Sequence, residues 1–299
     1  MNLVIRPADD GVDAESAAIG GLPEKGTSRV VMMRSPEALL ENFRCVGVRT
    51  TKLSEDYSPA FQVCLPYRGV FVWRVGDEDV VGDANQVLFV AGGEGFRVHQ
   101  PQSEPYAELI ITPNPNVLAE LVGSSPALLK QHPHFRRRSR RADPALQRRV
   151  AQFLNSKRRR WSDPLADDEV AVELLRGALQ GADGRPLPSR ATRRFTERSK
   201  EFLHAHLSDQ IRLSDVAQAV GVSATYLTDL FGRVEGVTLH RYLTQLRLSR
   251  AMIELPHAND LTALALRLGF SSHSHFTAAF RRAFGETPSR FRADARRQQ

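Results

Sequence analysis

The hydrophobic positions between Leu213 and Phe291 follow one short pattern twice. In the first copy, apolar residues recur at helical spacing from Leu213 until Gly221 interrupts the pattern. The second copy starts at Leu261 and is interrupted in the same way at Gly269. A repeat of this length indicates a repeated structural unit, and each unit is predicted to be a short helix, a turn and a second helix.

The second helix of each unit combines an apolar stripe with a polar face. A single pattern of this kind would also fit a helical hairpin of a bundle, but two copies favour a DNA-binding arrangement in which such helices enter the major groove. Removing the apolar stripe leaves the residues that we expect to contact DNA. They are Ala224, Thr225, Thr228, Asp229 and Arg233 in the first unit, and Ser272, His273, Ser274, Thr277, Ala278, Arg281 and Arg282 in the second.

One continuous helix is predicted between the two units, from Leu239 to Leu255, because Pro256 then ends the helical pattern. A helix of about 16 residues spans roughly 24 Å. It could therefore hold two recognition helices about one DNA turn, or ~34 Å, apart. Two adjacent major grooves would then be within reach of a single chain.

Several short motifs occur within residues 195–292. They are Asp215-Val-Ala, Gly-Val-Ser at 221–223, Tyr226-Leu-x-x-Leu-Phe231, Leu268-Gly-Phe, and Phe276-x-x-x-Phe280-Arg-Arg-x-Phe-Gly285-x-Thr-Pro288-Ser-x-Phe291-Arg292. Through these motifs, residues 195–292 resemble the DNA-binding domain of AraC-family bacterial transcription regulators. The resemblance implies a double helix-turn-helix domain that binds double-stranded DNA at a promoter or operator. It also implies contact with RNA polymerase if the protein is an activator.

Short β-branched or aromatic runs dominate residues 61–111, with a hairpin expected at Gly76-Asp77-Glu78. Many short strands at close spacing favour a small barrel or jelly roll. Gly82-Asp83 and the strand from Val87 to Val90 resemble the cupin-like effector-binding domain of many AraC-type regulators. The predicted fold class is therefore α+β. The predicted strands are Phe61–Leu65, Val70–Val75, Asp79–Val81, Gln86–Val90, Phe96–Val98 and Ala107–Ile111.

A cupin-like domain could instead be a metal-dependent enzyme with an accessory DNA-binding domain. Catalytic cupins use several histidines and a carboxylate at close spacing, whereas residues 60–112 contain only His99. We therefore expect no metal, no cofactor and no enzymatic activity, and a barrel that holds an unidentified small-molecule effector or is filled by side chains. The candidate effector-binding residues, each of which also fits an ordinary core or surface role, are Phe61, Trp73, Phe89, Phe96, Arg97 and His99.

Helical periodicity returns after the strands, in Val117–Leu129, Pro144–Asn155 and Asp167–Leu179. The family resemblance implies that these helices form a homodimer interface. A further short helix is predicted at Arg34–Phe43, opened by Ser35-Pro36. The chain is thus expected to comprise a mobile arm at 1–27, a cupin-like barrel at 28–115, a helical dimerisation region at 116–180, a linker at 181–194, and a DNA-binding domain at 195–299 with units at 213–234 and 261–284.

The formal net charge of +7 is unevenly distributed, because the first 125 residues are net acidic and the remainder is net basic. A basic C-terminal half fits a polyanionic partner. The arginine-rich runs at 136–141 and 157–160 could contact DNA phosphates or form solvated faces. Cys45 and Cys64 lack the spacing of a metal site and are expected to be reduced core residues. With no membrane-length apolar run and no secretion signal, we expect a cytoplasmic protein.

Asp229 departs from the basic or amide residue that AraC-type domains often have on the first recognition helix. Its carboxylate would repel phosphate, unless it accepts from a cytosine amine or points away from DNA. The sequence thus predicts a ligand-responsive, sequence-specific transcription regulator in which the second recognition helix leads. The alternatives are the metal-dependent enzyme and a DNA-binding protein that acts without a ligand.

Overall fold

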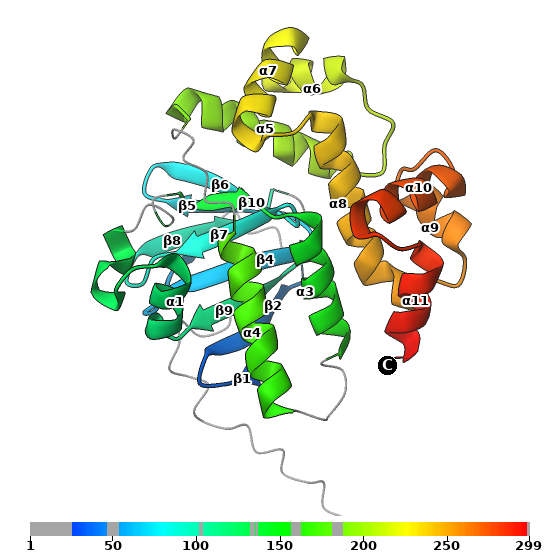
Figure 1. The fold of residues 1–299 in the computed structure, drawn as a ribbon. Helices are drawn as coiled ribbons and strands as arrows, with labels where there is room; N and C mark the ends of the chain where they lie inside the picture. Colours follow the sequence, from blue (N-terminus) through cyan, green and yellow to red (C-terminus); the bar gives the residue numbers. More distant parts are fainter. Residues whose placement is uncertain are drawn as a thin grey trace, which may run out of the picture.

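The computed structural model describes residues 26–46, 54–101, 104–131, 135, 137–156, 163–180 and 188–297. Antiparallel β-sheets come first along the chain and helices follow (Figure 1), which confirms the predicted α+β class. The predicted arm at 1–27 lies outside the described residues except for Gly26 and Thr27, and Thr27 begins a strand. Residues 181–187 of the predicted linker also lie outside them, whereas Arg190–Arg194 belong to a helix.

The strands form two sheets. The six-stranded sheet has the order β1 (Thr27–Arg34), β2 (Ala38–Cys45), β9 (Tyr106–Pro113), β4 (Gln62–Arg68), β7 (Gln86–Val90) and β10 (Ser139–Arg141). The four-stranded sheet has the order β3 (Ser54–Tyr57), β8 (Gly95–His99), β5 (Phe71–Val75) and β6 (Glu78–Gly82). All six predicted strands are confirmed, and so is the β5–β6 hairpin, in which Gly76 turns the chain at a φ of 57°.

The helix predicted at Arg34–Phe43 is wrong, because this segment contains the end of β1 and most of β2. The signal at Ser35-Pro36 opens a tight turn instead, with the Ser35 amide donating to the Ala38 carbonyl at 3.0 Å. Strand β2 then pairs with β1 on one side and with β9 on the other. Both faces of β2 are largely buried, which removes the alternation of apolar and polar residues that would have identified a strand.

Two apolar cores lie on opposite faces of the six-stranded sheet. One lies between the sheets and includes Trp73, Leu88 and Ile110. The other lies beneath the helices α1 (Pro115–Val122), α3 (Pro144–Ser156) and α4 (Pro164–Leu179) and includes Leu109 and Leu146. The helix predicted at Val117–Leu129 is interrupted at Gly123, whose φ of 63° ends α1, and a separate 3-10 helix covers Pro126–Gln131.

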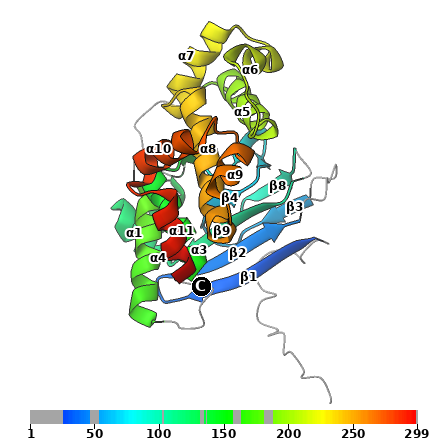
Figure 2. The ribbon, with the colours of Figure 1, turned by 90° about the vertical axis from the view of Figure 1, so that its right-hand side faces the viewer.

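The C-terminal helices build two further apolar cores, which share one long helix, and the helices of the two cores pack along different parts of it (Figures 1 and 2). That helix, α8 (Leu239–Glu254), confirms the prediction of a single helix between the units. Among the helices that the structure describes, none is both long and apolar enough to cross a lipid bilayer. The remaining helices are α5 (Arg190–Ala205), α6 (Leu213–Val220), α7 (Ala224–Glu235), α9 (Leu261–Arg267), α10 (His273–Phe284) and α11 (Pro288–Arg297), with a 3-10 turn at Leu255–His257.

Candidate nucleic-acid interface

The first repeated unit consists of α6, a glycine turn and α7. The α6 helix begins where the Asp215 carboxylate accepts from the Arg212 amide at 2.7 Å, and it ends at Gly221 with a φ of 82°. Ser223 then caps α7 by accepting from the Tyr226 amide at 3.2 Å. These caps satisfy backbone groups that helix ends leave unpaired, so the short helices are held at defined positions.

The second repeated unit consists of α9, a glycine turn and α10, and it follows the same plan. Asp260 caps α9 by accepting from the Thr262 amide at 2.7 Å, and Gly269 turns the chain at a φ of 84°. Ser272 caps α10, as Ser223 caps α7, by accepting from a backbone amide. The sequence repeat is therefore a structural repeat, since each glycine separates two short helices that share a small apolar core.

The predicted DNA contacts lie on α7 and on α10 together with its cap, and most are exposed. On α7, Thr225, Thr228, Asp229 and Arg233 are exposed and only Ala224 is half-buried. On the second unit the half-buried residues are His273 and Thr277, while the exposed ones are Ser272, Ser274, Ala278, Arg281 and Arg282. The N-terminal domain leaves both polar faces uncovered.

Asp229 is engaged within its own helix. Its carboxylate lies 2.8 Å from the guanidinium of Arg233, one turn further along α7, and both side chains are about two-thirds exposed. Thr228 is also turned back, donating to the Ala224 carbonyl at 3.0 Å. The polar face of α7 therefore presents a neutralised ion pair in place of an unpaired acid.

The α10 face has a different character. His273, Ser274, Thr277, Ala278, Arg281 and Arg282 line a shallow depression together with Thr287. The hydroxyl of Thr277 lies 3.5 Å from Nε2 of His273, which aligns these two side chains along the helix. Two arginines beside small polar side chains combine phosphate-binding charge with groups that can meet base edges.

The arginine-rich run at 136–141 is neither a solvated face nor an exposed phosphate contact where the structure describes its contacts. Arg138 pairs with Glu94, and Arg140 donates to the Gly177 carbonyl at 2.7 Å. Arg141 donates to the amide oxygen of Gln245 in α8. Because β10 lies at the edge of the six-stranded sheet, beside β7, the side chains of these arginines contact neighbouring elements and bind partners there. The run at 157–160 lies outside the described residues.

The six candidate effector-binding residues are not brought together. Trp73 and Phe96 lie between the sheets with ring centroids 5.1 Å apart. Arg97 and His99 belong to the opposite face of the four-stranded sheet, because they pair with Arg74 and Val72 while Trp73 pairs with Val98. The remaining two, Phe61 and Phe89, pack with Phe135 on the helix-covered side of the six-stranded sheet.

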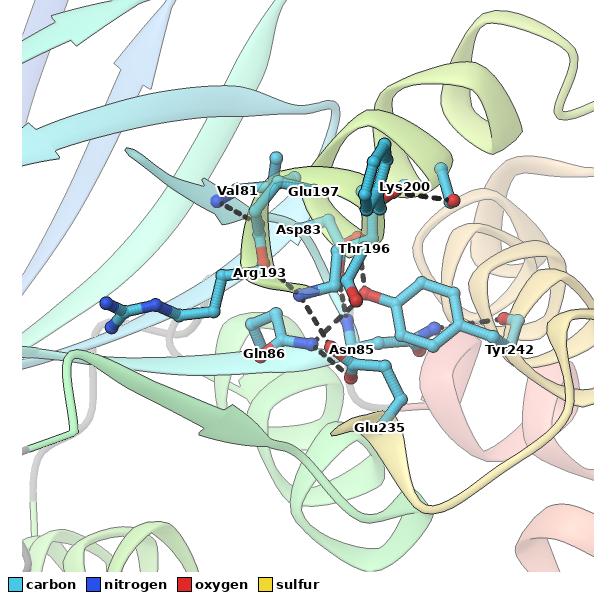
Figure 3. A network of polar contacts seen from close by, with 12 residues as sticks. Val81, Asp83, Asn85, Gln86, Arg193, Thr196, Glu197, Lys200, Glu235 and Tyr242 are labelled. Atoms are coloured by element: carbon cyan, nitrogen blue, oxygen red, sulfur yellow. Dashed lines mark hydrogen bonds and ion pairs between the residues drawn. The ribbon is translucent and has the colours of Figure 1, made fainter. Parts of the chain in front are cut away.

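A polar network that the sequence did not reveal joins the N-terminal sheets to α5, to α8 and to Glu235 at the end of α7 (Figure 3). Asp83, in the turn between β6 and β7, is fully buried; its carboxylate accepts from the Tyr242 hydroxyl at 2.8 Å and lies 3.0 Å from the His204 ring. Burial alone would raise the pKa of Asp83, but these two neighbours and the charge of Lys200 hold it below its ordinary value. The contact is therefore built around a buried carboxylate.

Lys200 forms the second centre of this network. Its ammonium lies 3.1 Å from Glu197 and 2.8 Å from Glu235, and the side chain is 1% exposed. Burial alone would lower the pKa of Lys200, but the two carboxylates raise it, so the ammonium stays charged. Glu197 also accepts from the Val81 amide of β6 at 2.6 Å, which ties α5 directly to the sheet.

The second repeated unit contacts the N-terminal domain through α3. Arg148 of α3 pairs with Glu286 at 2.6 Å, and Ala151 of the same helix lies in the apolar core of α9, α10 and α11. Both units are thus docked, the first through polar groups and the second through an apolar contact with an ion pair at its edge.

Residues 216–294 match the family model HTH_18, described as a helix-turn-helix domain. The chain is 36% identical over 100 residues to the regulator ExsA of Pseudomonas aeruginosa, covering 33% of this chain and 36% of ExsA. It is 33% identical over 97 residues to the virulence activator VirF of Yersinia enterocolitica, covering 32% of this chain and 36% of VirF. The matched region thus spans about a third of the length of these relatives.

Residues 216–294 form an AraC-type helix-turn-helix domain. Similar solved structures include an AraC-type regulator from Chromobacterium violaceum, with 29% identity, a TM-score of 0.34, and coverage of 36% of this chain and 96% of that one. Another is ToxT from Vibrio cholerae, with 11% identity, a TM-score of 0.33, and coverage of 86% and 98%. The resemblance noted in the sequence is confirmed for the AraC-type domain, and its two units are α6–α7 and α9–α10.

Proposed function

We propose that this protein is a sequence-specific transcription regulator that reads two adjacent major grooves, one with α7 and one with α10, and responds to a small-molecule effector. The observation that carries the proposal is the AraC-type domain with two capped units, each with an uncovered polar face. The α8 helix between them has 16 residues and is therefore about 24 Å long, a scale that suits two grooves one turn apart.

Effector response is supported by how the two parts of the chain meet. Val81 of β6 bonds to α5, Asp83 of the β6–β7 turn bonds to α8, and Gln86 bonds to Glu235 at the end of α7. Because α3 contacts α10 and α11, the N-terminal domain touches both units. A ligand that changed the packing of the sheets would therefore alter the position of α8 through the bond between Asp83 and Tyr242. Trp73, buried against Phe96 between the sheets, is the residue best placed to report such a change.

The first test uses DNA duplexes selected by the full-length protein from a random library. Footprinting on a selected duplex should show protection over two adjacent major grooves, and binding should exceed that to a scrambled duplex of equal length. Protection of one groove would contradict two-groove reading. Equal affinity for selected and scrambled duplexes would instead favour a DNA-binding protein without sequence preference.

The second test addresses the effector. In a Trp161→Phe background, the fluorescence of Trp73 should change when an inducing metabolite from a panel is added, and the same metabolite should change affinity for the selected duplex. No response across the panel would count against an effector site near Trp73. Metal analysis of the purified protein tests the alternative of a metal-dependent cupin enzyme. A stoichiometric metal would support that alternative and contradict the proposed function.

The proposal includes a homodimer formed through the helical region 116–180, by analogy with the family. Mass measurement in solution at several concentrations tests it, and a monomer at all concentrations would remove it. Contact with RNA polymerase belongs to the proposal only if the selected sites lie at promoters whose transcription the protein increases.

A further inference from the structure

Arg247 of α8 makes an unusual set of contacts. The side chain is 8% exposed, and its guanidinium donates to three backbone carbonyls, those of Leu207 at 2.7 Å, Asp209 at 2.7 Å and Gly269 at 2.8 Å. A buried arginine is ordinarily paired with a carboxylate, whereas here uncharged backbone oxygens receive its donors. The Arg247 side chain therefore connects backbone segments to one another.

The three carbonyls belong to two segments, the loop that precedes the first unit and the turn inside the second unit. Leu207 and Asp209 lie in the loop from α5 to α6, at the entrance to the first unit. Gly269 lies in the turn from α9 to α10, inside the second unit. Gln210 of the first loop adds a bond to the same Gly269 carbonyl at 2.9 Å. The loop of one unit and the turn of the other are thus fastened at one point.

Comparison of the two turn glycines shows how close this approach is. Gly221 and Gly269 are equivalent in the repeat, with φ values of 82° and 84°. A Cβ atom at Gly221 would meet no atom within 4 Å, whereas one at Gly269 would lie 2.8 Å from the guanidinium carbon of Arg247. The backbone conformation is shared, but only the second turn is pressed against the arginine.

The planar guanidinium can restrict rotation in a way that the apolar cores cannot. Each unit packs on α8 through its own core, and apolar contact is not directional. Hydrogen bonds from a rigid donor fork to both units fix direction as well as distance. Loss of these bonds would leave each unit folded on α8 while allowing the two units to shift relative to one another.

We propose that Arg247 is a positioning residue that fixes the orientation of α7 relative to α10, and with it the groove spacing that the protein accepts. The inference rests on the proposed two-groove function. Two linked binding modules gain affinity from their effective concentration only when geometry allows both to engage together. A fixed orientation therefore gives strong binding at one spacing and a steep loss at others.

The test measures binding of the full chain to a selected duplex and to versions with one to four base pairs inserted between the two protected grooves. Wild-type protein should lose affinity steeply on insertion, by about 10-fold to 100-fold. Arg247→Met should bind the unmodified duplex about 10-fold or more weakly and respond much less to insertion. Binding to a duplex with a single groove site should be unchanged, which a general loss of folding would not produce.

Two matched controls separate positioning from charge and from turn strain. Arg250→Met removes an arginine from the same helix that pairs with Glu254, and it should keep the wild-type spacing preference. Gly221→Ala and Gly269→Ala impose the same strain on a left-handed glycine, but only Gly269→Ala crowds Arg247. The Gly269 variant should therefore flatten the spacing response while the Gly221 variant does not.

The outcomes are distinguishable. If wild-type protein protects only one groove, the proposed function fails. If wild-type protein protects two grooves and folded Arg247→Met keeps the wild-type spacing response, the inference fails. If Arg148→Ala alone flattens the response, docking to α3 sets the orientation, and this also overturns the inference. Should Arg247→Met not fold, the pair of glycine variants decides the question.

Discussion

The hydroxyl of Tyr242 donates to the carboxylate of Asp83 across 2.8 Å, and both side chains are fully buried. Tyr242 belongs to α8, between the two helix-turn-helix units, whereas Asp83 belongs to the turn between β6 and β7. Gln86 donates to the same hydroxyl at 3.1 Å, and Asn85 donates to the Tyr242 carbonyl at 2.9 Å. Tyr242 is therefore bonded to two residues of the β6–β7 turn, Asp83 and Asn85, and to Gln86 at the start of β7.

Tyr242→Phe should weaken this contact without opening the core around the ring. It removes one donor to Asp83, and loss of a hydrogen bond to a buried charged group costs on the order of 1 to 3 kcal/mol. The thermal unfolding midpoint of the full chain should fall accordingly. Tyr226→Phe is the matched control, since Tyr226 is 45% exposed on α7 and should change little. Equal midpoints for wild type and Tyr242→Phe would contradict a stabilising contact.

Glu108→Gln should change how stability depends on pH. Glu108 lies inside the sheets beside Cys64, and burial raises its pKa to about 7, from an ordinary value of 4.5. The folded state binds this proton more tightly than the unfolded state. The stabilisation that results is fully present below about pH 4.5 and is lost as pH rises through about 7. At pH 8, Glu108→Gln should exceed wild type in unfolding free energy by roughly 3 kcal/mol at most.

The measurement for Glu108→Gln is denaturant unfolding at several pH values between 4.5 and 8, analysed as the difference between variant and wild type. Other titrating groups cancel in that difference. Glu120→Gln, which changes an exposed carboxyl of α1, is the matched control. A flat difference for Glu108→Gln would show that its proton is not bound more tightly in the folded state.

Asp229→Ala should tighten binding to every sequence. The Asp229 carboxylate neutralises Arg233, so its removal frees a cation on the polar face of α7, and one more phosphate contact steepens the salt slope by ~1. Binding to selected and scrambled duplexes at two salt concentrations measures this. Asp294→Ala, which removes an acid from α11, controls for net charge. Loss of discrimination at one base pair would mean that Asp229 accepts from a cytosine amine instead.

His273→Ala and Thr277→Ala should relax preference at particular base pairs, because these side chains lie together in the depression along α10. Each lost base contact should reduce discrimination by roughly 1 to 3 kcal/mol. Arg282→Ala should instead weaken binding to selected and scrambled duplexes alike, as expected for a phosphate contact. Competition assays with single-base-pair substitutions distinguish these cases. Unchanged discrimination in both His273→Ala and Thr277→Ala would refute a leading role for α10.

The elements that sequence predicts well are those whose signal is local. Gly221 and Gly269 stop short helices at once, and the alternation of turns and β-branched runs locates β4 to β9. β2 was missed because Leu39-Leu40-Glu41-Asn42-Phe43 lies between two strands and is covered on both faces, so it lacks alternation.

The long-range contacts could not be predicted, for a different reason. Asp83, Lys200 and Tyr242 are far apart along the chain, and each has an ordinary local context. Only their shared burial makes them a network. Likewise, the sequence left the run at 136–141 open between a phosphate contact and a solvated face, whereas Arg138 and Arg141 have partners that only the fold supplies.

The charged character of the contact around Asp83 and Lys200 also bears on what happens when the two parts of the chain separate. Four ionisable side chains, Asp83, Glu197, Lys200 and Glu235, would enter water, where each is well hydrated. An interface of packed leucines would instead expose an adhesive apolar patch on each half. This face of the separated parts should consequently stay hydrated, and any tendency to aggregate should come from the apolar contact between α3 and the core of α9, α10 and α11.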